Sequence, residues 1–244
     1  MFIYAAFGCF GFVGALALIQ PRRNTSAQIV MMLGALSGGI AAAYFAIASM
    51  SGWQGTVYLA GGIFRLHAPA AFFFALVSLG VLLTSAFAIG YLPRYAASFS
   101  LREVNFASAL FVSGMLAVIL SNSPAAFLVS WEVMSLSAYF LVIADRSEES
   151  LYAGFLYFIM TQLGFFALLA GFLVLAQGAI FAPWLTVSAS TGGLSTTTLA
   201  FAFFLLFIGF GSKAGLVPLH QWLPYAHPQA PSHSSALLSG AMLS

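Results

Sequence analysis

The stretch LAFAFFLLFIGFGSKAGLVPLHQWLP, residues 199–224, decides the fold class of this chain. It holds a long apolar run, one charged side chain, Lys213, and then Pro218 and Pro224. An apolar run that approaches ~20 residues is typical of a membrane-spanning helix. Proline lacks an amide hydrogen and clashes with the preceding turn, so Pro218 predicts that this helix is interrupted just beyond Lys213.

The composition of the whole chain agrees with a membrane protein. Of its 244 residues, 62% are hydrophobic and only 5% are charged. A soluble domain carries roughly a quarter charged residues, and disorder requires low hydrophobicity, so both classes are excluded. The net charge of +2 is too small to indicate nucleic-acid binding. The single cysteine, Cys9, excludes a disulfide framework within the chain.

Apolar runs and helix breakers predict an all-α, polytopic bundle with about seven complete helices and a truncated eighth. Between the second and third helices we expect a short strand at 56–59 and a turn at 61–62, whereas 178–198 is a looser connection. An eighth apolar segment begins at 232 and is about half of what spanning requires. The seven complete helices are predicted, in chain order, at 2–19, 28–50, 70–92, 104–120, 124–144, 151–177 and 199–216.

Basic residues in the predicted loops indicate the orientation. Loops at the ends of odd-numbered helices carry Arg22, Arg23, Arg94, Arg102 and Arg146, and the intervening loops carry only Arg65. Positively charged loops stay in the cytoplasm, so the N-terminus is predicted to lie outside. No basic segment precedes the first apolar run, which favours a retained first helix over a cleaved signal peptide.

Two charged residues, Glu132 and Lys213, lie well inside predicted helices. An ionised group at such depth costs ~2.5–3.5 kcal/mol on insertion scales, so it must be paired, hydrated or neutralised. For Glu132, the functional interpretation is a proton or ion relay, and the alternative is a structural ion pair that joins two helices. For Lys213, the alternative is a side chain that extends to the membrane interface.

Histidines follow the predicted break. His220, His227 and His233 lie close together, but no carboxylate or thiol accompanies them, so a metal site is not expected. We predict a titrating histidine at a membrane port for His220, and hydrogen-bonded loop histidines for the other two. Trp222 and Tyr225 are predicted to be interfacial aromatics. No nucleotide, haem or iron–sulfur motif is present in the sequence, so we expect no cofactor and no redox chemistry in this chain.

Two long motifs carry a family resemblance. Residues 130–141, SWEVMSLSAYFL, resemble the glutamate-bearing helix of the antiporter-like subunits of respiratory complex I, subunits L, M and N of NADH-quinone oxidoreductase. Lys213 followed by PLHQWLPYA, residues 218–226, resembles the broken helix of the same subunits. The segment SALLSGAM, residues 235–242, is most similar to the large membrane subunit of formate hydrogenlyase and hydrogenase-4 complexes.

The resemblance implies a proton-translocating subunit with inverted helix repeats, of which this chain covers the first. Residues 1–244 then form one transmembrane domain: the first three helices (1–103), the part with the charge pair (104–217), and the broken-helix loop with the start of helix eight (218–244). The implied proton-relay residues are Glu132, Lys213 and His220, with no catalytic, cofactor-binding or metal-binding residue.

The resemblance also implies partners and a location. The partners are other membrane subunits, membrane lipids, and a peripheral redox arm that carries iron–sulfur clusters and flavin or a nickel–iron centre. The location is a bacterial inner membrane. The chain departs from the family at His67, where many relatives have an acidic residue, and at Ser244, where relatives often have a lysine. A fragment, half of a split gene and an inactive half-subunit all fit this pattern, and a cation/proton antiporter subunit and a non-pumping scaffold are the alternative functions.

Overall fold

The structure is a computed structural model that describes residues 26–50, 55–95 and 100–242. The predicted first helix, 2–19, lies outside the described residues. Within the described part, six helical stretches are long and apolar enough to cross a membrane, which confirms the polytopic helical bundle. The long helices are α2 (Ser26–Met50), α3 (Ala68–Tyr91), α4 (Leu101–Leu120), α5 (Pro124–Val142), α6 (Glu148–Leu175) and α8 (Thr196–Ala214).

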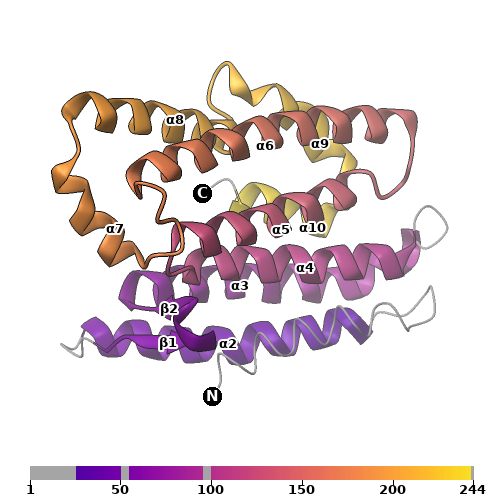
Figure 1. The fold of residues 1–244 in the computed structure, drawn as a ribbon. Helices are drawn as coiled ribbons and strands as arrows, with labels where there is room; N and C mark the ends of the chain where they lie inside the picture. Colours follow the sequence, from indigo (N-terminus) through magenta and orange to yellow (C-terminus); the bar gives the residue numbers. More distant parts are fainter. Residues whose placement is uncertain (1–25, 51–54, 96–99, 243–244) are drawn as a thin grey trace.

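Three pairs of long helices pack most extensively: α2 with α3, α4 with α5, and α6 with α8. In Figure 1 the helices follow one another up the molecule, from α2 at the bottom to α6 and α8 at the top. Small residues allow the close approach within each pair, as is usual between membrane helices. A Cβ atom on Gly114 of α4 would lie 2.7 Å from the backbone nitrogen of Met134 on α5. The apolar pattern of the sequence predicted these helices, but it did not predict the glycine contacts at which they pack together.

Shorter elements complete the fold. The predicted strand and turn form a hairpin, in which β1 (Val57–Leu59) pairs antiparallel with β2 (Phe64–Leu66). The connection 178–198, predicted as a loose segment, contains the helix α7 (Trp184–Ser190), which hydrophobic periodicity did not reveal because it is only 7 residues long. After α8 come α9 (Leu223–Gln229) and α10 (Ser232–Leu237), and α10 continues as one π-helical turn over Leu238–Met242.

Asn122, in the turn between α4 and α5, joins three parts of one end of the bundle. Its side-chain amide donates to the Gly62 carbonyl at 2.9 Å, and its backbone N–H donates to the Ile63 carbonyl at 3.0 Å. Its own carbonyl accepts from the backbone N–H of Trp184 at 2.9 Å. The hairpin, the α4–α5 turn and α7 are thus held together by one buried residue.

Replacing Asn122 with alanine should lower the free energy of unfolding by about 1–2 kcal/mol, because the Gly62 carbonyl loses its side-chain donor. The measurement is thermal unfolding of the purified protein in detergent. Ser188→Ala is the matched control, because Ser188 is exposed and its hydroxyl donates to the Leu185 carbonyl of the same helix. Equal unfolding temperatures for the two variants would contradict this role of Asn122.

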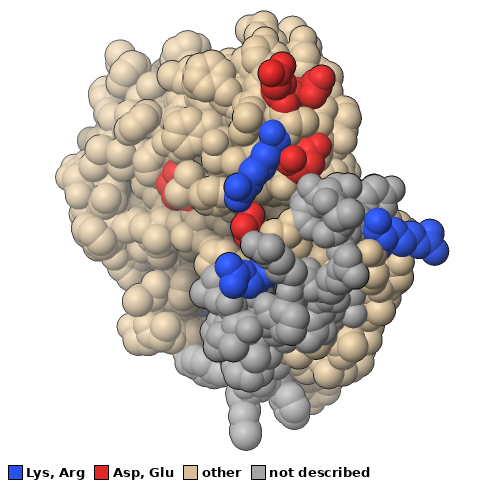
Figure 2. Space-filling view, turned by 90° about the vertical axis from the view of Figure 1, so that its right-hand side faces the viewer, with Lys and Arg blue, Asp and Glu red and all other residues tan. Residues whose placement is uncertain are grey.

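The opposite end of the bundle carries most of the charged side chains (Figure 2). The α5–α6 loop and the start of α6 hold Asp145, Arg146, Glu148 and Glu149, all of them exposed. Arg146 forms a 3.0 Å ion pair with Glu103 at the start of α4. Burial raises the pKa of Asp145, but hydrogen bonds from Ser150 and Ser147 outweigh it and leave that pKa below its ordinary value. This end is therefore a solvated, polar surface.

Candidate functional site

The broken helix positions the site. Helix α8 ends at Ala214, and Gly215 follows in the left-handed conformation with φ 71°, which glycine adopts without steric cost. The N–H groups of Gly215 and Leu216 both donate to the Gly211 carbonyl. The chain resumes as the 3₁₀ turn Leu219–Trp222 and then α9. The predicted interruption between Lys213 and Pro218 is confirmed, and the helix already ends at Gly215, before the proline.

Trp222 compensates for the break. Its indole N–H donates to the Ser212 carbonyl at 2.9 Å, one of the carbonyls that a helix end leaves without an intrahelical partner. The side chain is only 1% exposed and packs edge-on against Tyr157. The prediction that Trp222 is an interfacial aromatic was therefore wrong. Tyr225, in contrast, is 50% exposed.

Lys213 lies in the last turn of α8 and is 3% exposed. Its ammonium donates to Ser135 Oγ on α5 at 2.9 Å and to the Tyr157 hydroxyl on α6 at 3.0 Å. It also lies 5.6 Å from the centre of the Trp131 ring, within cation–π range. The C-terminal end of a helix carries partial negative charge, which further favours a cation there. Lys213 is thus held inside the bundle and does not extend to an interface.

Glu132 lies on α5 and is half-buried. Its Oε2 atom accepts a hydrogen bond from Gln162 Nε2 on α6 at 3.0 Å. Its Oε1 atom is buried and has no hydrogen-bond partner among the described residues. A carboxylate can accept several hydrogen bonds, so the buried Oε1 atom of Glu132 could still accept a hydrogen bond.

The two charged groups share one site without direct contact. Within the described residues the ion pair closer than 4.0 Å is Arg146 with Glu103, and Glu132 and Lys213 do not form another. Glu132 nevertheless interacts electrostatically with both Lys213 and Tyr157. Each charged group is therefore held by its own polar neighbours, with the other charge nearby.

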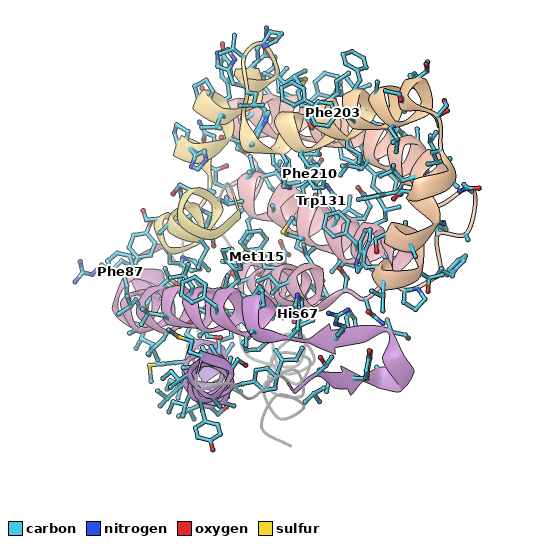
Figure 3. The ribbon with its side chains drawn as sticks, turned by 90° about the vertical axis from the view of Figure 1, so that its left-hand side faces the viewer. His67, Phe87, Met115, Trp131, Phe203 and Phe210 are labelled. Atoms are coloured by element: carbon cyan, nitrogen blue, oxygen red, sulfur yellow. The ribbon has the colours of Figure 1, made fainter. Side chains whose placement is uncertain are left out.

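A cavity of about 620 Å³ opens beside the site. Lys213 forms part of its wall, and most of the remaining lining is apolar, from α3, α4, α5, α8 and α10. Figure 3 shows Trp131 of α5 and Phe210 of α8 next to one another between these two helices, with Met115 of α4 below them. The Trp131 and Phe210 rings meet edge-on with centres 5.8 Å apart. The lysine is therefore enclosed on one side by hydroxyls and on the other by an apolar space.

The histidines differ in their surroundings. His220 is exposed on the 3₁₀ turn, and no hydrogen bond links it to Lys213 or Glu132 in the described structure. His227 and His233 lie in α9 and α10, so the prediction that they are loop residues was wrong. His233 is buried, with a ring nitrogen 3.1 Å from Ser234 Oγ.

His67 lies outside this group. It is the residue at the N-terminal cap of α3. Partial burial, and secondly the charge of Arg65, lower the pKa of the His67 imidazole below its ordinary value. We therefore expect His67 to be neutral near pH 7.

Three polar partners of the charged residues were not predicted from the sequence: Ser135, Tyr157 and Gln162. Tyr157 is fully buried, and Gln162 stands in the apolar run of α6. The available signal was the side-chain amide itself, because polar groups inside membrane helices usually bond across to another helix. Which helix they reach depends on packing, and packing was not available from the sequence.

The fold and this site define the class of protein: an integral, multi-pass membrane protein with the architecture of an antiporter-like subunit. Residues 121–244 match the family described as NADH:quinone oxidoreductase/Mrp antiporter, transmembrane. The chain belongs to this family, which confirms the resemblance seen in the two motifs.

Similar proteins come from several membrane complexes. The chain is 40% identical over 183 residues to hydrogenase-4 component B of Escherichia coli, strain K12, a match that covers 73% of this chain and 26% of that protein. Its fold is similar to a chain of the membrane-bound sulfane sulfur reductase, an archaeal respiratory membrane complex, with TM-score 0.83, 19% identity, and coverage of 99% of this chain and 50% of that chain.

A chain of the Mrp complex from Dietzia sp. DQ12-45-1b is also similar, with TM-score 0.76, 24% identity, and coverage of 99% and 45%. The two structural comparisons concern the fold alone. This chain spans about half of each of the two structural neighbours and about a quarter of the hydrogenase-4 component.

Proposed function

We propose that this chain is part of a proton-translocating membrane subunit of a complex-I-like NADH-quinone oxidoreductase or membrane-bound hydrogenase. The observation that carries the proposal is the pair of ionisable groups in the bundle, Glu132 on α5 and Lys213 on α8, next to a helix that is broken at Gly215. Ionisable residues at membrane depth usually belong to ion or proton pathways. Discontinuous helices are a common way to build such a site.

The chemistry of the proposal is electrostatic. An opposite charge nearby favours the charged form of a group, so the protonation of Lys213 depends on the position of the Glu132 carboxylate. The Ser135 and Tyr157 hydroxyls, at 2.9 and 3.0 Å from the ammonium, are in place to accept its hydrogen bonds and pass protons on. His220 remains a proposed relay residue at the exposed side of the break.

Energy for transport would come from partner subunits. We propose that the cofactors, iron–sulfur clusters with flavin or a nickel–iron centre, are bound by a peripheral arm. We propose none in this chain. We propose a bacterial inner membrane as the location. The arginine distribution supports an orientation with the N-terminus outside and the charged end of Figure 2 in the cytoplasm.

A second candidate is a subunit of a cation/proton antiporter. The family description names the Mrp antiporter beside the oxidoreductase, and the fold is similar to a chain of an Mrp complex. An antiporter would move protons when a sodium gradient is imposed, and a pump would do so when an electron donor is oxidised. A scaffold would do neither.

The test is Glu132→Gln in inverted membrane vesicles that hold the assembled complex. This substitution keeps the shape of the side chain and one acceptor oxygen for Gln162 but removes the titrating charge. We expect proton uptake per substrate oxidised, normalised to subunit content, to fall by about 10-fold or more, as is typical when a proton-transfer group is lost.

The matched control is Glu148→Gln, at an exposed position in the first turn of α6, which should leave uptake unchanged. Unchanged uptake in Glu132→Gln at normal subunit levels would refute the relay. A loss of subunit from the membrane, with uptake per subunit preserved, would favour the scaffold.

A further inference from the structure

We propose that Gln162 is a positioning residue of the charge pair: its side-chain amide holds the Glu132 carboxylate apart from Lys213 and so sets how often the two charges meet. This inference rests on the proposed function, and it assigns a role to a residue that neither motif contains.

The contact that suggests this role joins α5 and α6. Gln162 Nε2 donates to Glu132 Oε2 at 3.0 Å, while Glu132 Oε1 has no partner among the described residues. The carboxylate is therefore tethered through a single oxygen. Hydrogen bonds to a charged acceptor are stronger than neutral ones, so this one tether is enough to select a side-chain conformation.

Lys213 is held against the same helix, α5, by a different residue. Ser135, which binds the ammonium at 2.9 Å, lies three residues after Glu132 on α5. Residues three apart on a helix lie on the same face, with Cβ atoms about 5–6 Å apart. A change of side-chain conformation at Glu132 could thus carry the carboxylate from Gln162 toward the ammonium without moving a helix.

The two candidate donors for the carboxylate differ in chemistry. The Gln162 amide does not titrate, so it holds Glu132 without exchanging a proton. The Lys213 ammonium carries charge and can release a proton, and a neighbouring hydroxyl that accepts it must pass its own proton onward. The described structure is the separated arrangement, in which the amide has the carboxylate and the two hydroxyls have the ammonium. The Gln162 amide and the Lys213 ammonium therefore compete for the Glu132 carboxylate, and this competition sets how often the two charged groups meet.

The first experiment is structural and does not depend on activity. We expect a cryo-EM structure of the complex carrying Gln162→Leu to place a Glu132 carboxylate oxygen within salt-bridge distance of Lys213 Nζ. The matched control is Gln177→Leu, because Gln177 is exposed and its amide binds the Ser190 carbonyl instead. In that control the charges should stay apart. If they also stay apart in Gln162→Leu, the proposal is overturned.

The second experiment is proton uptake in the vesicle assay. Losing a hydrogen bond to a charged group shifts a local equilibrium by about 10-fold or more, here toward the closed pair. If Glu132 stays bound to Lys213, the charge pair no longer switches between its joined and separated arrangements. We therefore expect Gln162→Leu to lower proton uptake about 10-fold at normal subunit content. Uptake by Gln177→Leu should be unchanged. Gln162→Met, of nearly the same length as glutamine, replaces the leucine variant if that variant does not accumulate.

A variant on the lysine side separates positioning from packing. Tyr157→Phe removes one hydroxyl that holds Lys213 and keeps the ring, so a structure of this variant should also show the two charges closer together. Uptake is not the readout for this variant, because the Tyr157 hydroxyl is itself a proposed relay group. If Glu132→Gln abolishes uptake while the Gln162 variants pump normally, only the positioning role fails. If Glu132→Gln itself has no effect, the proposed function fails, whatever the Gln162 variants show.

Discussion

Replacing Lys213 with methionine is expected to reduce proton movement to the background leak of the vesicles while the protein still folds. Methionine has a similar length and no charge, so it can fill the same space between α5, α6 and α8. An ionised lysine at this depth costs ~2.5–3.5 kcal/mol, and removing it removes that cost. The hydroxyls of Ser135 and Tyr157 lose one donor each, which offsets part of the gain. We therefore expect Lys213→Met to lose proton movement while the amount of folded protein stays close to normal.

The measurement pairs proton uptake per substrate oxidised with the amount of subunit in the membrane. Arg146→Met is the matched control, because it removes a positive charge whose partner, Glu103, lies on the exposed end of the bundle. That control should keep normal uptake, since surface ion pairs contribute little. Combining Lys213→Met with Glu132→Gln should add almost nothing to either change alone, because residues that act as a unit are not additive. Substantial uptake by Lys213→Met would exclude Lys213 from the pathway.

Replacing Gly164 with valine is expected to produce the largest loss of folded protein. Gly164 lies on α6 where it packs against α8. A Cβ atom at this position would collide with Ser212 Oγ and lie 3.2 Å from the Gly209 carbonyl. The obstacle is partly backbone and cannot move without separating the helices. Overpacking of this kind costs roughly 3 kcal/mol. It would also displace Ser212 and the adjacent Lys213.

Subunit content by immunoblot and the unfolding temperature of the purified complex measure this effect. Gly192→Val is the control, because a Cβ at Gly192 meets nothing within 4 Å. We expect the control to accumulate at the normal level and Gly164→Val to accumulate at a small fraction of it. Equal accumulation of the two variants would mean that α6 and α8 are not packed as closely as the structure has them.

The site divides into residues that the sequence identified and residues that it did not. Glu132 and Lys213 were identified because a charge inside an apolar run is conspicuous in a chain with 5% charged residues. Gln162, Ser135 and Tyr157 are of types that membrane helices also carry for packing, and nothing in their spacing separates the two uses. For His220, sequence and family resemblance predicted a relay residue, and the structure shows an exposed side chain without a link to the charged pair.

By itself, the sequence determined the membrane class, the predicted helices that fall within the described part and the break after Lys213. Each follows from local chemistry: apolar length, prolines and glycines, and the cost of charge in lipid. Only the tertiary structure decided that α6 lies against both α5 and α8. In that packing Glu132 binds Gln162, and Lys213 binds Ser135 and Tyr157, so the two charged residues do not contact each other. Glycine contacts set how closely the helices approach. The tertiary structure also turned Trp222 inward, because the Ser212 carbonyl at the helix end required a donor.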